Sequence, residues 1–82
     1  MYDIIISDTA KKAFLNLEKE IQDRIVAVLE RIQLQPHHYC IRLTGSNAYK
    51  LRAGDYRVIL DINEQNQQII ILKIGHRKNV YE

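Results

Sequence analysis

The stretch YKLRAGDYRVIL, residues 49–60, carries three cationic side chains, Lys50, Arg52 and Arg57, on a segment that otherwise has the pattern of a β-hairpin. The Gly-Asp dipeptide at its centre predicts a two-residue turn of the primed type, which places Arg52 directly opposite Arg57. Opposed like charges in a strand pair cost roughly 0.2–1 kcal/mol. The pair therefore indicates a place where an anion binds between two guanidinium groups.

The same register sorts the side chains of the hairpin onto two faces, because alternate residues of a strand point in opposite directions. The apolar face holds Leu51, Ala53, Tyr56, Val58 and Leu60. The other face holds Lys50, Arg52, Arg57 and Ile59. The three cations thus leave the core face uninterrupted. The alternative interpretation is that the long arginine stems extend into water, with Asp61 as a nearby counter-charge.

Apolar spacing in the first half of the chain predicts the elements that support this hairpin. Residues 2–6 are short, β-branched and apolar, which is typical of a buried strand. A first helix follows from an N-cap at Ser7 or Asp8. A second helix covers residues 19–35 and ends at Pro36, because the residue before a proline is disfavoured in the α region. The short join between the helices predicts an antiparallel helical hairpin.

After a connector at residues 37–48, the period changes from that of a helix to that of a strand. Residues 49–53, 56–62 and 68–74 are predicted as three strands, and the run IIIL at 69–72 suggests that the last strand is covered on both faces. The order β-α-α-β-β-β predicts an α+β fold. In it, the two-helix antiparallel hairpin packs on one face of a mainly antiparallel four-stranded sheet.

Composition favours a small globular protein. The 82 residues are 46% hydrophobic and 27% charged, which argues for one folded domain spanning residues 1–82. Net charge is +2, and the positive charge is concentrated in residues 42–82, which suits an acidic or polyanionic partner or a solvated basic face. The lone cysteine, the acidic residues around a short apolar N-terminus and the lack of a long apolar run predict a cytoplasmic protein without a membrane span.

Two motifs carry a resemblance to a known family. Gly-Asp-Tyr-Arg-Val, in the hairpin, is followed about twenty residues later by Gly-His-Arg-Lys-x-Val-Tyr at the end of the chain. With the β-α-α-β-β-β order, this pairing resembles the RelE toxins of type II toxin–antitoxin systems, within the wider RelE/ParE superfamily. The resemblance covers nearly the whole chain.

The resemblance implies a toxin that enters the ribosomal A site and cuts messenger RNA there without a metal or other cofactor. In that reaction the ribose 2′-OH attacks the adjacent phosphate and leaves a 2′,3′-cyclic phosphate. The family positions for catalysis correspond to Arg57, Arg77 and Tyr81, and Lys50 and Arg52 match basic positions on the preceding strand. Familiar relatives have a lysine where this chain has Ala48, and a slightly longer spacing between the last arginine and tyrosine.

These residue types suit the implied reaction. Two guanidinium groups, Arg57 and Arg77, would hold the nonbridging oxygens as negative charge develops. Arginine does not titrate in the useful range, so the proton acceptor is Tyr81, Lys50 or His76. Alternation places His76 and Arg77 on opposite faces and thereby favours a structural role for the histidine.

Further contacts to substrate are predicted at Arg52, His76 and Lys78. Tyr39, Tyr49 and Tyr56 are candidates to stack on bases, with Tyr56 expected to point inward. The adjacent histidines 37 and 38 have no spaced Cys, Asp or Glu partners, so no metal site is predicted.

The expected partners are a cognate RelB-like antitoxin, the 70S ribosome and mRNA, with operator DNA reached only through the antitoxin and no membrane. Two other functions remain open. ParE-like proteins of the superfamily inhibit DNA gyrase by binding, without RNA chemistry. The alanine at position 48 also leaves room for a catalytically degenerate homologue that only binds its antitoxin.

Overall fold

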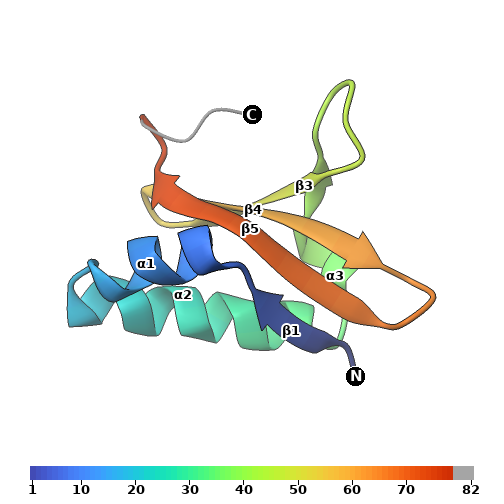
Figure 1. The fold of residues 1–82 in the computed structure, drawn as a ribbon, viewed down its shortest axis with the longest axis horizontal. Coiled ribbons are helices and arrows are strands. Elements are labelled where there is room, and N and C mark those ends of the chain that lie inside the picture. The colour runs from blue at the N-terminus through green and yellow to red at the C-terminus, as the bar shows by residue number, and fades with distance from the viewer. Residues whose placement is uncertain (79–82) are drawn as a thin grey trace.

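The computed structural model describes residues 1–78 and has helices on one side of a single sheet, as Figure 1 shows. The sheet has five strands in the order β1-β5-β4-β3-β2. The strands are β1 (Asp3–Ile6), β2 (Ile41–Arg42), β3 (Tyr49–Ala53), β4 (Tyr56–Asn63) and β5 (Gln68–His76), and the helices are α1 (Asp8–Leu15), α2 (Lys19–Ile32) and α3 (Pro36–Tyr39). The α+β prediction is confirmed, with β1 parallel to β5 and the other pairs antiparallel.

The first helix begins where the sequence predicts. The hydroxyl oxygen of Ser7 accepts a hydrogen bond from the backbone N–H of Ala10 at 3.1 Å, which satisfies one of the unpaired donors of the first turn. The same hydroxyl donates to the carbonyl oxygen of Leu72 on β5 at 3.0 Å. One serine therefore caps α1 and ties it to the sheet.

The region between the helices and the hairpin departs from the prediction. The second helix ends at Ile32 rather than at residue 35, and Pro36 begins the short α3 instead of following a helix. Proline suits that first position because it has no N–H to leave unpaired. The predicted connector also contains β2, which pairs with Tyr49 and Lys50. The predicted four-stranded sheet therefore lacks one strand of the observed five-stranded sheet. A two-residue strand leaves no alternation to detect.

The core lies between the helical layer and one face of the sheet. Its largest fully buried side chains are Ile25, Ile32, Leu60, Ile69, Ile71 and Val58. The first two come from α2 and the rest from the central strands β4 and β5. None of the helices in the described part of the chain is long and apolar enough to cross a membrane.

The register of the β3–β4 hairpin is the predicted one. Ala53 pairs with Tyr56, Arg52 with Arg57, and Lys50 with Ile59. Gly54 has a φ of 64°, in the left-handed region that the first position of this turn requires. The glycine thus fixes which cations face each other.

Replacing that glycine should weaken the hairpin. In Gly54→Ala, a β-carbon at positive φ is expected to lower the free energy of unfolding by about 1–2 kcal/mol. The clash with the Arg24 side chain, whose Nη1 would lie 2.7 Å from the new β-carbon, adds little because that end can swing away. Thermal unfolding measures the loss, roughly 4–8 °C per kcal/mol in a domain of this size. The exposed turn variant Gln65→Ala is the control, and equal melting temperatures for the two variants would contradict the assignment.

A bulge in the β4–β5 pair changes which side chains share a face. Leu60 pairs with Ile71 but Ile59 pairs with Lys73, so Leu72 has no partner of its own. Ile71 and Ile74 are buried, whereas Leu72 is 37% exposed. The prediction that residues 69–72 are covered on both faces is therefore wrong at Leu72.

Candidate functional site

The face of the sheet away from the helices carries two cross-strand rows of side chains, which together we call the open face. The first row, read from β2 to β5, is Ile41, Lys50, Ile59 and Lys73. The second row, one step nearer the β3–β4 turn, is Arg52, Arg57 and Gly75. Four cations therefore project from one face of three adjacent strands.

Burial differs along these rows because β4 is central and the flanking strands lie nearer the edges. Ile59 is only 6% exposed although it lies outside the main core cluster. Lys50 and Arg57 beside it are half-buried, whereas Arg52 and Lys73 are exposed. Ile59 is thus a buried apolar residue in a row of cations, at a position where the aliphatic stems of lysine and arginine commonly cover apolar surface.

The end of β5 brings Arg77 to the same end of the sheet. Its backbone N–H donates to the carbonyl oxygen of Asp55, in the β3–β4 turn, at 2.9 Å. Gly75, two residues earlier, faces Arg57 and adds no side chain to the open face. Arg77 is exposed and follows the last residue of β5, so it lies at the turn end of the hairpin that carries Arg52 and Arg57.

His76 lies on the other side of the sheet. It pairs with Tyr56, and the two rings meet edge to face with centroids 5.4 Å apart. Its Nδ1 also accepts a hydrogen bond from the backbone N–H of the exposed Lys78 at 3.3 Å. This placement agrees with the structural role that alternation favoured and separates His76 from Arg57. Tyr81 lies outside the described residues.

One cation of the open face was missed from the sequence. Strict alternation from the buried Ile69 and Ile71 would turn Lys73 toward the core. The bulge at Leu72 shifts that alternation by one residue, so Lys73 faces outward opposite Ile59. A lysine at an apparent core position was the available signal, because an unpaired buried ammonium group is too costly to be common.

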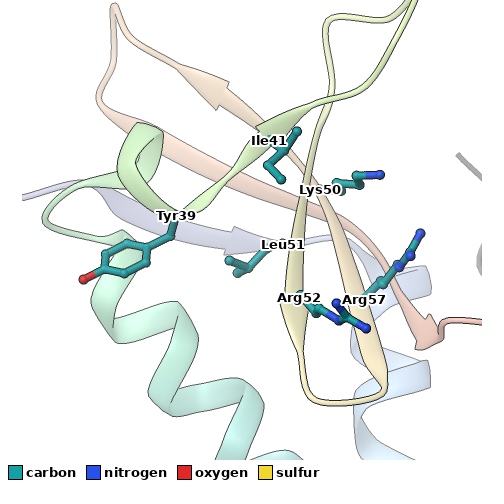
Figure 2. Close-up of a pocket in the computed structure, with 6 residues that line it drawn as sticks. All are labelled: Tyr39, Ile41, Lys50, Leu51, Arg52 and Arg57. Atoms are coloured by element: carbon teal, nitrogen blue, oxygen red, sulfur yellow. The ribbon is translucent and has the colours of Figure 1, made fainter.

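A pocket of about 240 Å³ opens beside the cations, at the outer edge of β3 (Figure 2). Its aromatic and apolar lining comes from Tyr39, Ile41 and Leu51, and its cationic lining from Lys50, Arg52 and Arg57. Figure 2 shows Tyr39 and Leu51 on one side of β3 and Lys50 and Arg57 on the other. Two lining residues were not site candidates from the sequence: the strand of Ile41 was not predicted, and Leu51 was assigned to the apolar face.

A second polar cluster lies at the other end of the sheet, near the β4–β5 turn. The Tyr2 hydroxyl donates to Glu64 Oε2 at 2.6 Å, and His37 Nε2 contacts Glu64 Oε1. The hydrogen bonds from Tyr2 and then His37 lower the pKa of the Glu64 carboxyl. Within residues 1–78 no three His, Cys, Asp or Glu side chains gather as a metal site would require. The cluster therefore joins the N-terminus and α3 to the sheet.

Cys40 should be unreactive in the folded protein, because burial raises the pKa of its thiol to about 11. The folded protein therefore binds the thiol proton of Cys40 more tightly than the unfolded chain does. The resulting stabilisation is present below about pH 9 and is lost as the pH rises toward 11. We expect iodoacetamide at pH 8 to alkylate native protein roughly 100-fold or more slowly than urea-unfolded protein. Equal rates would contradict the burial of Cys40.

Comparison with known families identifies the chain. The profile described as the ParE toxin of the type II toxin–antitoxin system parDE matches residues 4–81. Since that match covers nearly every residue, the family assignment extends over both helices and the sheet. No match is found among curated protein sequences.

Solved structures with the same fold include chains of toxin–antitoxin complexes. A chain of the RelBE2 complex from Mycobacterium tuberculosis is 22% identical with a TM-score of 0.86, covering 93% of this chain and 98% of that one. A chain of the archaeal RelE-RelB complex from Pyrococcus horikoshii is 28% identical with a TM-score of 0.78, covering 96% and 98%. A chain of the intact Escherichia coli RelBE complex is 18% identical with a TM-score of 0.81, covering 93% and 96%.

The cationic open face thus lies on a fold that matches RelE toxins, and the full-length profile match agrees with it. The chain belongs to the ParE toxin family, within the RelE/ParE superfamily of type II toxin–antitoxin toxins.

Proposed function

We propose that this toxin is a ribosome-dependent endonuclease that cleaves messenger RNA in the A site and so inhibits translation. The observation that supports this most is the pairing of Arg52 with Arg57 at the end of the sheet to which the backbone ladder also brings Arg77. If these guanidinium groups only extended into water, the fold would have no need to bring them to the same end of the sheet. Three of them gathered at one end of the sheet would form a binding site for a phosphate whose negative charge increases during reaction.

The reaction assigned to the site is an attack within the substrate. The 2′-oxygen of one ribose bonds to the adjacent phosphorus, the bond from phosphorus to the 5′-oxygen of the next nucleotide breaks, and the products are a 2′,3′-cyclic phosphate and a 5′-hydroxyl end. Arg57 and Arg77 hold the nonbridging oxygens, and Arg52 contacts the neighbouring backbone. Arg57 is suited to the central position because it is half-buried, which limits its rotamers and excludes part of its water.

We assign proton transfer to Lys50 or Tyr81. Lys50 lies on the open face, half-buried, opposite Ile59 and one row from Arg57. In this role Lys50 would accept the proton of the 2′-OH as the 2′-oxygen attacks. Tyr81, which matches the C-terminal tyrosine of the family, is the alternative proton acceptor. Lys78 is assigned to contacts with the substrate backbone, and His76 is left out because it packs on Tyr56.

A RelB-like antitoxin is the proposed inhibitor. The related solved complexes from Mycobacterium tuberculosis, Pyrococcus horikoshii and Escherichia coli pair toxins of this fold with such antitoxins. We assign operator DNA to the antitoxin alone and give the toxin no membrane partner. The ribosome supplies the positioning that so few acid-base groups cannot supply by themselves.

A second function, inhibition of DNA gyrase by binding, is favoured by the match to the ParE profile. The two functions are separated by inducing the toxin without antitoxin and measuring protein synthesis by pulse labelling alongside gyrase-DNA cleavage complexes. Early arrest of protein synthesis with mRNA cuts supports the nuclease. Trapped gyrase complexes without mRNA cuts would overturn the nuclease proposal. Normal growth would indicate a catalytically degenerate homologue, the interpretation that Ala48 suggests.

A further inference from the structure

We propose that the pocket at the outer edge of β3 binds one unstacked RNA base next to the cleaved phosphate, with Tyr39 as the stacking partner. This inference rests on the proposed function, because it assigns the neighbouring cations to the RNA backbone. It adds a base-binding subsite to a site otherwise built only for phosphate.

The pocket exists because β2 is short. Its two residues pair with Tyr49 and Lys50, so the outer edge of β3 from Leu51 onward has no strand beside it in the described part of the chain. The chain leaves α3 at Tyr39 and enters β2 at Ile41, which places both side chains along this gap. The result is a cavity lined by the edge of β3, the Tyr39 ring and the Ile41 side chain.

Two apolar side chains of the pocket are open to solvent beside its cations. Tyr39 is 44% exposed and Ile41 is 65% exposed. The Tyr39 ring meets the adjacent His38 ring edge to face, with centroids 4.8 Å apart. An aromatic ring open to solvent is a platform for stacking a base.

Charge and size then favour a nucleotide over an apolar ligand. Three of the six lining side chains are cations, Lys50, Arg52 and Arg57, so the pocket offers phosphate contacts next to its apolar wall. Its volume of about 240 Å³ is below the roughly 300–1,000 Å³ of pockets that enclose drug-sized molecules. One planar base fits that space, with its phosphate toward the arginines.

The register places this subsite one nucleotide from the chemistry. Arg52 faces Arg57 in one row, and Lys50 faces Ile41 in the next row, roughly 6.7 Å further along the strand. A single strand with its reacting phosphate on Arg57 and Arg77 can therefore continue past Arg52 toward Tyr39. The flanking base would be read here, which makes the pocket a determinant of codon preference.

Binding is tested without ribosomes, with a fluorescently labelled RNA hexamer whose 2′-O-methyl sugars prevent cleavage. At low ionic strength, where phosphate contacts are strongest, anisotropy should show roughly 5- to 100-fold weaker binding by Tyr39→Ala than by wild type. Leu15→Ala, on the exposed side of α1, is the matched control and should bind as wild type does. Equal affinity of Tyr39→Ala and wild type would overturn the inference.

A second readout uses Tyr39→Trp, since the chain contains no other tryptophan. The hexamer should quench this fluorescence, whereas a hexamer of the same length with abasic sites should bind without quenching. Equal quenching by both, or quenching by an acidic peptide but not by RNA, would overturn base binding and assign the pocket to a protein segment.

The outcomes for this pocket and for the nuclease are distinguishable. If wild type cuts A-site codons but Tyr39→Ala cuts the same codons at the same rate, the pocket inference fails and the nuclease stands. If wild type does not cut but the base-dependent quenching is observed, the nuclease fails and the RNA-binding pocket stands.

Discussion

Arg77→Ala is expected to slow cleavage of A-site mRNA by roughly 100- to 1,000-fold while leaving the fold intact. Loss of one preorganised donor to a developing oxyanion typically costs that much. Arg77 is exposed, and the contact that fixes its position uses its backbone N–H, which alanine keeps. The rate is measured by single-turnover cleavage on programmed ribosomes, and thermal unfolding should give a melting temperature within about 2 °C of wild type.

The neighbouring exposed lysine provides the control for this arginine. Lys78→Ala removes one positive charge from the same end of the sheet and should slow cleavage less than about tenfold, because a backbone contact mainly affects binding. Equal losses of cleavage rate in both variants would mean that Arg77 contributes only its positive charge. Unfolding of Arg77→Ala would make it a structural residue.

Leu60→Ala is expected to have the largest effect on stability, about 3 kcal/mol, because it leaves a cavity in the core. Leu60 is fully buried in the central strand that also carries Arg57. A domain of 82 residues has roughly 4–12 kcal/mol of stability in total. The melting temperature should therefore fall by roughly 12–24 °C.

Leu72→Ala makes the same chemical change in the neighbouring strand. The bulge leaves Leu72 unpaired and 37% exposed, so the loss should be below about 1 kcal/mol. Chemical denaturation of both variants measures the difference. Equal losses would show that the bulge does not turn Leu72 away from the core.

The hairpin was predictable from the sequence because its turn is local. Gly54 at positive φ fixes the register, and the register then fixes that Arg52 faces Arg57 and that Lys50 shares their face. Ser7 as an N-cap follows from equally local chemistry. These features depend on neighbours a few positions away in the chain.

What could not be predicted depends on residues distant in sequence. The bulge that turns Lys73 outward arises from the pairing of β5 with β4, and its one trace within β5 is a lysine at an apparent core position. The two-residue β2 forms only because the β3 edge is available to it. The pocket that joins Tyr39 to Arg57 follows from both α3 and β2, so its members did not form a motif.

The most direct test of the nuclease is primer extension on a reporter mRNA in a reconstituted translation system, with and without ribosomes. The proposed function predicts cuts within A-site codons that require ribosomes and are nearly absent on naked RNA. Efficient cutting of free RNA would contradict ribosome dependence. No cuts at all by a folded, toxic protein would contradict the nuclease itself and point to gyrase.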